Sequence, residues 1–576
     1  MVKNFLIIFT AVLVIALPFI FRKEKPVGEW KEGDPVLVAI SPHIASIRDE
    51  FALGFSNWHY KKYGKPVKID WRSIGGTTEI MRYINGEYTA AYKAYRLRNK
   101  LSYVDGVNVT DKRKPKDDPA KAELWEDFRA HDNPEDYGIK IDIFFGGGTY
   151  DHSSAARQGL TVIPWTAETM PKGIIEDEAG ACIFPEGLSG EDWRNDYFYS
   201  AVLSGFGICY NPDRLKEMGV ENPPTEWRDL RDLTYFGQLA LTDPTKSGSV
   251  AKTFEMIIHT ECRNIVYEAG WTDEQINEFE KKIAAAKLPN GVMPEGVPQK
   301  YQEDVERGWK SGLDLIRQMG MNVRYFTDAA GKVPVDVAAG DAALGISIDF
   351  YSRVQAEVTR DKLNGAERLI FVNPKGGSSI SGDPISLLRG SENKELALRF
   401  MEYVLSEDGQ KLWNYKPGTP GGPTTSALRR LPVRRDFYPS SDNATINAKA
   451  LEHNKYTSDN LLDPKVDAYS LANDFMYRYR WTGRHFSFFR QFIRAMCMDS
   501  GVELRAATKA IIEAGGPEKC PQAMEALMRM PSAPYEMSWT ASLENSDIDS
   551  MECMREWTIF FRNTYKEAER LAKEGK

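Results

Sequence analysis

The sequence predicts an α/β fold with mostly parallel sheets, and two observations support that prediction. First, a short hydrophobic strand runs four times into a small, polar turn and then into a helix. Second, strands and helices keep alternating as far as about residue 412, a pattern typical of parallel sheets with helices on both faces. From about residue 429 the pattern becomes helical to the last residue.

The clearest of these units is residues 142–159, DIFFGGGTYDHSSAARQG. A hydrophobic strand enters three glycines, and Thr149 then opens a short helix that Gly159 stops. Glycines let the backbone approach a ligand closely, and a helix start offers unpaired N–H donors and the positive end of a dipole. Such a turn suits an anion or a polar group, although plain packing of a strand–helix turn explains the same residues.

Two similar units come earlier in the chain. Residues 35–40 (PVLVAI) form a strand pattern, after which Ser41 is expected to cap a helix. Residues 66–71 form the next strand, which Gly76 and Thr77 connect to a second helix. Both turns therefore place small or hydroxyl side chains at a helix start.

Between and after these units the pattern changes. Residues 86–136 are rich in charge and are expected to be a partly helical surface insertion. Residues 200–210 (SAVLSGFGICY) read as a buried strand interrupted by glycines, and residues 237–241 form the strand of the fourth unit. Ser247 and Ser249 stand at the start of the helix that follows.

The later part of the chain contains further short strands. One of them, residues 343–348, runs into Asp349 and Tyr351, and residues 393–412 form an amphipathic helix. Residues 475–497 interleave arginines with aromatics, which can indicate single-stranded nucleic-acid binding. An amphipathic segment packed on the main body explains this composition better, because the whole chain carries a net charge of −8.

Composition and motifs narrow the class of protein. A content of 42% hydrophobic and 27% charged residues is that of a globular protein. The six cysteines show no CxxC spacing, so a zinc site is not expected and buried thiols are the preferred interpretation. Because the GxSxG, GxxxxGK and HExxH motifs are all absent from the sequence, we expect neither an enzyme nor a cofactor.

The first 27 residues have a different character. Residues 5–21 are almost entirely apolar, with Lys3 before them and Arg22, Lys23 and Lys25 after them. This is the pattern of an export signal or membrane anchor, and the lack of a small-x-small cleavage site favours an uncleaved anchor. The basic residues that follow would place the body in the cytoplasm by the positive-inside rule. Export is nevertheless expected, for the reason given next.

From residue 36 to about residue 423 the chain resembles the solute-binding proteins of ABC importers. The nearest branch includes receptors for iron(III), thiamine, aminoethylphosphonate and sugar phosphates. The matching segments occur in the order of that family: VLVAISPHIASI, GGTTEIMRYI, DIFFGGGTYDHSSAARQGL, SGFGICYNPDRLKEMG, TEWRDLRDLTYFGQLALTDPTKSGS, IDFYSRVQAE and ISGDPISLLRGSENKELALRFMEYVLSEDGQKLW.

The resemblance implies a two-lobed periplasmic-binding-protein fold (type II) with a hinge, and a helical C-terminal extension that the family does not explain. Solute would lie in the cleft, the hinge would close around it, and a membrane permease would recognise the closed form. The protein would be periplasmic, and residues 5–21 could tether it to the inner membrane. The expected division is 1–27 signal or anchor, 36–200 lobe 1 with the insertion, 201–372 lobe 2, 373–428 the return to lobe 1, and 429–576 the extension.

A phosphorylated or phosphonate-bearing organic anion is the solute that these residues favour. Hydroxyl groups and backbone N–H groups at helix starts suit phosphate oxygens, while carboxylates and a tyrosine could hold an amine or hydroxyls of the organic part. The expected ligand-binding residues are Ser41, His43, Gly76, Thr77, Gly148, Thr149, Ser204, Ser247, Ser249, Asp349, Tyr351 and Asp383.

Two alternatives stay open. Iron(III) receptors of this fold hold the metal through adjacent tyrosines, whereas DFYSRV has one tyrosine beside a phenylalanine. A metal site would therefore need His43 and His152 with Asp151 and Asp349, since Fe(III) prefers hard anionic oxygens or imidazoles. In the other alternative, a sensory or scaffolding receptor uses the helical extension to dock a partner.

Overall fold

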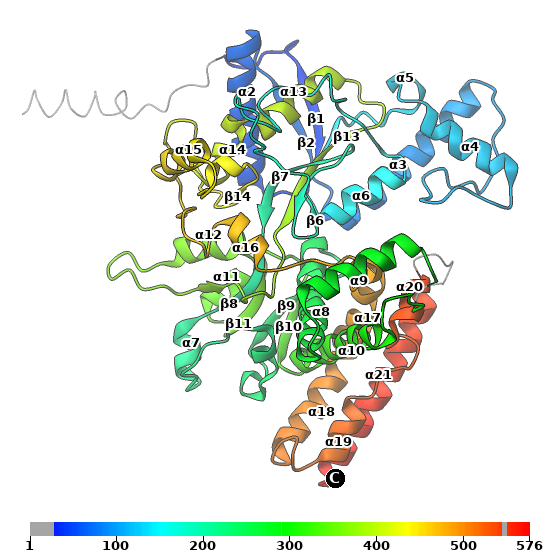
Figure 1. Ribbon diagram of the computed structural model, residues 1–576, viewed down its shortest axis with the longest axis vertical. Helices are drawn as coiled ribbons and strands as arrows, with labels where there is room; N and C mark the ends of the chain where they lie inside the picture. Colours follow the sequence, from blue (N-terminus) through cyan, green and yellow to red (C-terminus); the bar gives the residue numbers. More distant parts are fainter. Residues whose placement is uncertain (1–27, 290, 544–549) are drawn as a thin grey trace, which may run out of the picture.

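Two α/β lobes lie one above the other in the computed structural model, and a helical arm projects from the lower one (Figure 1). The structure describes residues 28–289, 291–543 and 550–576. The expected signal or anchor, residues 1–27, lies outside this part of the chain. Within the described part, none of the helices is both long and apolar enough to span a membrane. The expected α/β, two-lobed fold with a hinge and a C-terminal extension is confirmed.

The sheet of lobe 1 runs in the order β14-β7-β13-β3-β1-β2, and β4 also pairs with β13. The strand β1 is parallel to β2 and β3, as the strand–turn–helix units predict, whereas β13 is antiparallel to β3 and β7. The strand bounds are β1 Val36–Ile40, β2 Lys68–Arg72, β3 Ile143–Phe145, β4 Thr161–Val162, β7 Tyr199–Ser204, β13 Ser381–Leu388 and β14 Leu431–Pro432.

Helices cover both faces of this sheet. On one face α2 (Ala45–Tyr63), α13 (Lys394–Leu405) and α14 (Glu407–Asn414) bury aromatic side chains against it. The other face carries α3 (Thr77–Arg98) and α6 (Thr149–Arg157). Large apolar groups are thereby removed from water on both sides, which is the main favourable contribution to folding.

The first helix start differs from the expectation. The helix α2 begins at Ala45 and has Ile44, not Ser41, at its N-cap, without a side-chain cap bond. The Ser41 hydroxyl oxygen instead accepts a hydrogen bond from the backbone N–H of His43 at 3.1 Å. The three residues between Ser41 and the helix therefore form a short extended link at the edge of the cleft described below.

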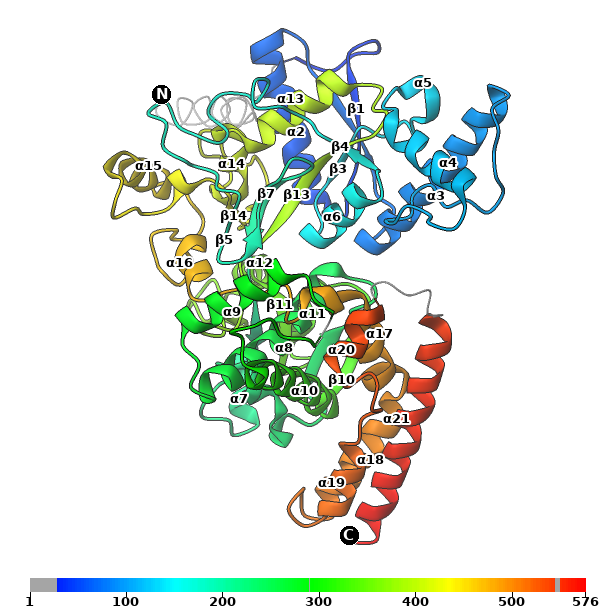
Figure 2. The same cartoon turned by 45° about the vertical axis from the view of Figure 1, so that its right-hand side comes forward.

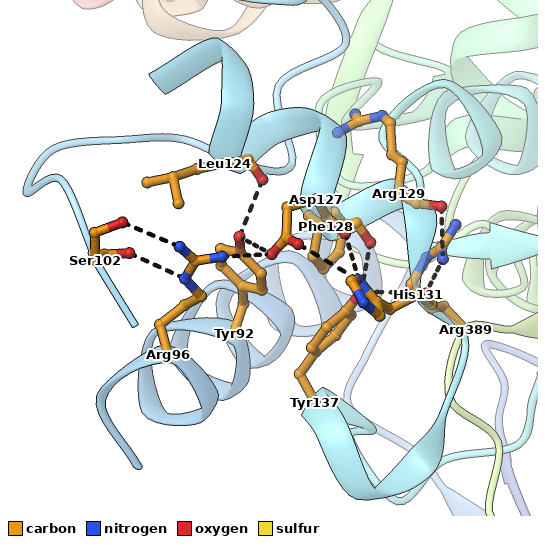
Figure 3. Close-up of polar contacts among 10 residues, drawn as sticks. All are labelled: Tyr92, Arg96, Ser102, Leu124, Asp127, Phe128, Arg129, His131, Tyr137 and Arg389. Atoms are coloured by element: carbon orange, nitrogen blue, oxygen red, sulfur yellow. Dashed lines mark hydrogen bonds and ion pairs between the residues drawn. The ribbon is translucent and has the colours of Figure 1, made fainter. Parts of the chain in front are cut away.

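Hydrogen bonds hold the insertion, residues 86–136, against the rest of lobe 1 (Figure 3). The helix α3 continues through Gly86, and α4 (Pro119–Ala130) and α5 (Pro134–Tyr137) follow it. Asp127 accepts hydrogen bonds from Tyr92 Oη at 2.6 Å and Arg96 Nη1 at 2.8 Å. Arg389, just after β13, donates to the carbonyl oxygens of Arg129 and His131.

The sheet of lobe 2 runs in the order β10-β9-β11-β8-β12. The strands β9, β10 and β11 are parallel to one another, and β8 is antiparallel to both β11 and β12. Their bounds are β8 Phe206–Tyr210, β9 Leu239–Thr242, β10 Val323–Thr327, β11 Leu344–Ile348 and β12 Ile370–Val372. The covering helices are α7 Pro212–Glu217, α8 Gly248–Glu268, α9 Asp273–Ala286, α10 Gln299–Met321, α11 Lys332–Ala339 and α12 Asp349–Thr359.

Within the described chain, the backbone passes between the lobes at three places. The first is Gly205, between β7 in lobe 1 and β8 in lobe 2, so lobe 1 runs past residue 200 to Ser204. The second is residues 373–380, between β12 and β13. The third is residues 475–486, which lead from the core of lobe 1 to that of lobe 2. Together these passages form the hinge.

The C-terminal extension packs on both lobes (Figure 2). Its first half, with α15 (Ala444–Asn454) and α16 (Ala468–Asn473), buries aromatic side chains in the core of lobe 1. Its second half joins the core of lobe 2 around α8 and α10. The helices of that half are α17 Phe486–Ile493, α18 Gly501–Glu513, α19 Pro521–Leu527, α20 Met537–Leu543 and α21 Ser550–Lys573.

One part of the extension is not helical, contrary to the expectation for residues 429–576. Leu431 and Pro432 form β14, which pairs with β7 at the edge of the sheet of lobe 1. Proline has no N–H to donate to a ladder, so it is tolerated at a sheet edge. The chain therefore returns to the sheet once more after α14, before the helices of the extension begin.

Candidate functional site

A cleft of about 830 Å³ lies between the lobes. Its walls come from lobe 1, from lobe 2 and from the extension, which contributes Tyr477, Tyr479, Gly483 and Phe486. The helix starts that line it include those of α3 and α6 from lobe 1 and that of α8 from lobe 2. Loops and helix starts at the carboxyl ends of strands are where open α/β sheets generally bind ligands.

These three helix starts are in direct contact across the cleft, so the lobes are closed. A methyl group added at Gly76 would lie 2.8 Å from the carbonyl oxygen of Lys246 in lobe 2. One added at Gly248 would lie 3.0 Å from Asp151 Oδ2 and 3.1 Å from Thr77 Oγ1, both in lobe 1. Only glycine permits this approach without displacing a neighbour.

The helix starts leave hydrogen-bond donors facing the cleft. Gly76 and Gly148 occupy the N-caps of α3 and α6 and supply no side-chain cap. The backbone N–H groups of Thr77, Thr149 and Gly248 donate to no protein acceptor in the part of the chain that the structure describes. Three such starts at one point create a positive potential suited to an anionic group.

A buried carboxyl group, that of Asp151, already lies at this point. It belongs to the first turn of α6, and burial raises its pKa above the ordinary range. The nearby charge of Arg490, the hydroxyl of Thr77 and the N–H of Gly148 oppose that rise. The net shift of the pKa is upward because burial penalises the charged form, and whenever this carboxyl group is protonated it can donate a hydrogen bond.

A second polar network lies deeper in the cleft, around Asp383. Arg430 Nη1 approaches Asp383 Oδ2 at 2.5 Å, and His43 Nε2 lies 3.2 Å from the same oxygen. The N–H of Gly147 donates to the other oxygen, and Arg430 Nη2 donates to Ser204 Oγ at 2.8 Å. Although burial alone would raise the pKa of Asp383, the cationic Arg430 and the hydrogen bonds lower it far below its ordinary value.

His43 is neutral in this setting. Burial lowers its pKa, and Arg430 lowers it further, while Asp383 only partly compensates. The lowered pKa disfavours the imidazolium form that a charge-assisted bond to a solute anion would need. The imidazole instead orients the Asp383 carboxylate.

A third network connects both lobes to the extension. Lys252, in α8, lies 2.8 Å from Glu191 Oε1 in lobe 1 and 3.1 Å from Glu255 Oε2 in lobe 2. Its ammonium group also lies 3.6 Å from the ring centroid of Tyr477, a cation–π contact. Tyr477 Oη in turn donates to Glu255 Oε1 at 2.6 Å.

The structure brings most of the expected ligand residues together. Those that line the cleft are His43, Gly76, Thr77, Gly148, Thr149, Ser204, Ser247, Ser249, Tyr351 and Asp383. Ser41 and Asp349 do not line it, and both are buried behind it. Asp349 accepts a hydrogen bond from the N–H of Phe350 at 2.7 Å and lies 3.5 Å from Arg353. Both residues therefore support the wall of the cleft.

The residues considered for a metal site do not converge in the described structure. Both ring nitrogens of His152 are occupied, by Ser386 Oγ at 2.7 Å and by the carbonyl oxygen of Gly146 at 3.1 Å. Within the described ranges, ligand atoms at metal-binding spacing are found away from the cleft, at Glu407, Asp436 and His453. There Arg434, Lys449 and Lys411 already pair with the two carboxylates.

Sequence reasoning missed three charged or aromatic groups of the cleft: Arg430, Lys252 and Tyr477. Arg430 lies two residues beyond the expected end of lobe 1, in the basic run LRRLPVRR. In the sequence, this binding residue could have been found from the two adjacent arginines that precede a hydrophobic edge strand. Tyr477 lies in the arginine–aromatic segment, whose composition alone does not show which rings reach the cleft.

A cleft between two α/β lobes, with helix starts from both lobes, is an arrangement found in solute-binding proteins. Residues 172–437 match the family model of bacterial extracellular solute-binding proteins. That model describes solute-binding proteins, which is the class that the sequence resemblance predicts.

A relative from Haemophilus influenzae, an uncharacterized protein, is 22% identical over 273 residues, which are 47% of this chain and 60% of that protein. The match thus spans less than two thirds of the relative's length.

Solved structures with a similar arrangement include the periplasmic binding protein AfuA from Actinobacillus pleuropneumoniae with exogenous fructose-6-phosphate bound. It is 16% identical, with 79% of this chain and 98% of that chain covered and a TM-score of 0.44. An ABC transporter substrate-binding protein from Bradyrhizobium japonicum is 13% identical, with 80% and 99% covered and a TM-score of 0.43.

Proposed function

We propose that this protein is the periplasmic receptor of an ABC importer and captures a small phosphorylated or phosphonate-bearing organic solute by hinge closure. The observation that supports the solute class is the meeting of three helix starts, two from lobe 1 and one from lobe 2, with unpaired N–H groups. A phosphate oxygen bound there would join the lobes directly, because each lobe supplies donors to the same anion.

The raised pKa of Asp151 lowers the cost of binding an anion beside this carboxyl group. A carboxylate at this position would repel a phosphate, whereas a protonated carboxyl group donates a hydrogen bond to it. Burial favours the protonated form. An incoming anion favours it further, since like charges disfavour ionisation.

The other networks would hold the organic part of the solute. Asp383 accepts hydrogen bonds, and its charge is compensated by Arg430, so a hydroxyl or amine of the solute would meet an acceptor that is already fixed. Phe350, Tyr351 and Tyr477 add apolar surface to the same cleft. A permease in the inner membrane is the partner that would then receive the closed receptor.

A thermal-shift screen of the purified protein tests this proposal. The panel contains aminoethylphosphonate, sugar and polyol phosphates, thiamine phosphates, polyamines and Fe(III) citrate. We expect a phosphorylated or phosphonate compound to raise the melting temperature by a few degrees, because ligand at about a hundred times its Kd adds roughly 2.7 kcal/mol of stability. The substitutions Thr77→Val and Ser249→Ala should reduce that shift.

The matched control is Thr89→Val. Thr89 lies in the same helix as Thr77, but its hydroxyl donates to the carbonyl oxygen of Asn85 and does not line the cleft. This variant should keep the wild-type response. A response to Fe(III) alone, or one that Thr77→Val and Ser249→Ala leave unchanged, would refute the proposed solute class.

A further inference from the structure

The helix α17 of the extension begins at Phe486, which lines the cleft, and it contacts both lobes. Phe488, Phe489 and Phe492 on this helix are buried in the core that the extension shares with α8 and α10 of lobe 2. The helix therefore moves with lobe 2. It lies beyond residues 172–437, so the family match does not account for it.

Three contacts connect α17 to lobe 1. The ring of Phe486 stacks on that of Tyr150 with centroids 4.6 Å apart, and Tyr150 Oη lies 2.7 Å from Ser487 Oγ. Arg490 Nη2 donates to Thr78 Oγ1 at 2.9 Å. Tyr150 and Thr78 belong to the first turns of α6 and α3, the two helix starts of lobe 1 that line the cleft.

The guanidinium group of Arg490 also holds the loop before α8 in lobe 2. Its Nε donates to the carbonyl oxygen of Pro244 at 2.8 Å, and its Nη2 lies 3.1 Å from that of Thr245. The planar fork of arginine suits several acceptors in fixed directions. A single side chain of the extension thus connects the starts of α3 and α8 from opposite lobes.

We propose that Arg490 and Tyr150 are positioning residues for solute capture: they fasten lobe 1 to the extension when the cleft closes. The inference rests on the hinge-closing function proposed above. The Arg490–Thr78 and Tyr150–Phe486 contacts exist only while the lobes are together, because their partners are carried by different lobes. They raise the closed fraction, and a solute that binds the closed form gains affinity in proportion.

The alternative is that α17 packs on lobe 2 without holding lobe 1. A neighbouring arginine, Arg494, has contacts of that kind. Arg494, one turn further on, lies 2.7 Å from Asp243 Oδ2 and 3.3 Å from Thr245 Oγ1, both in lobe 2. Among its contacts in the described chain, none reaches lobe 1. Arg494→Gln is therefore the matched control for Arg490→Gln.

Small-angle X-ray scattering of the full, unliganded protein tests the inference without any solute. We expect the radius of gyration of the wild type and of Arg494→Gln to agree with the closed structure. Arg490→Gln and Tyr150→Ala should increase it, because losing one such contact shifts the closed-to-open ratio about tenfold toward the open form. Circular dichroism checks folding, and if Arg490→Gln does not fold, Thr78→Val removes the same contact from lobe 1.

An open wild type, an unchanged radius in the Arg490, Thr78 and Tyr150 variants, or an equal increase in Arg494→Gln would overturn the inference. Because scattering needs no ligand, the scattering result still tests this inference if no compound in the thermal-shift screen raises the melting temperature. Where a solute has been found, Arg490→Gln should weaken its binding by the factor by which the closed fraction falls, and Arg494→Gln should not.

Discussion

Arg430 and Asp383 are a buried ion pair whose two members come from different strands of lobe 1. Asp383 lies in β13 and Arg430 just before β14, and the guanidinium group also packs 4.3 Å from the ring centroid of Phe350 in lobe 2. A buried charge without its partner is costly, since the desolvation is then uncompensated. The pair thus fixes the end of lobe 1 against the hinge.

Replacing one member of this pair should therefore cost far more than replacing both. We expect Arg430→Met to lower the free energy of unfolding by about 3–5 kcal/mol, and Arg430→Met with Asp383→Asn to recover part of the loss. Urea denaturation at pH 7 measures both. Equal losses in the single and double variants would show that the pair contributes only through packing.

The same pair gives a pH dependence with a definite sign. Asp383 has a lowered pKa in the folded state, so its stabilising contribution is fully present above its unfolded pKa of about 3.9. That contribution is lost as the pH falls through the folded pKa. In the Asp383→Asn variant this part of the acid destabilisation should be missing from the denaturation curves.

Residues at helix starts could be predicted from the sequence, whereas the buried charges could not. Thr77, Thr149 and Ser247 follow a strand and small residues, which is a local pattern. Arg430 and Lys252 face the cleft because their partners, Asp383 and Glu191, arrive from distant parts of the chain. Nothing near either residue in the sequence indicates that pairing.

Among the elements, the packing of α8 on α10 depends on glycine. A methyl group at Gly312 would lie 2.6 Å from Ile258 Cα, so the two helices approach backbone to backbone. Similar contact occurs at Gly308, next to Cys262. The helical pattern of the sequence does not indicate that α10 packs at the centre of lobe 2.

This contact predicts opposite effects of the same substitution at two helical glycines. Gly312→Ala should destabilise the protein by about 1–3 kcal/mol, because backbone atoms of α8 have to move. Gly86→Ala in α3, where a methyl group meets nothing within 4 Å, should stabilise it by up to about 1 kcal/mol. Thermal denaturation of both variants compares them, and a neutral Gly312→Ala would contradict the close approach.

On the scale of the whole molecule, the extension contributes buried side chains to the cores of both lobes. Trp481, Phe489 and Phe561 are buried in the core of lobe 2, and Phe437 and Tyr438 in that of lobe 1. The strand–helix alternation predicted the two α/β bodies because it reflects local periodicity. It could not predict where the extension packs, since an amphipathic helix has an apolar face without indicating its partner.

Deleting the chain after Leu428 should therefore abolish folding rather than remove an appendage. The deletion removes β14, Arg430 and apolar surface from both cores. We expect no cooperative thermal transition by circular dichroism and no soluble monomer by size exclusion. A truncated protein with an unchanged melt would show that the extension is an independent unit.

Within the described chain, the backbone passes between the lobes three times. Because three is an odd number, the two ends of the described chain lie on opposite lobes. Gly28 packs on Tyr60 in α2 of lobe 1, whereas Lys576 ends the helical arm on lobe 2. Tension applied between those ends would pull the cleft open, so solute should resist extension in a single-molecule pulling experiment. For the same reason, fluorescent proteins fused next to Gly28 and after Lys576 would turn hinge motion into a change in energy transfer.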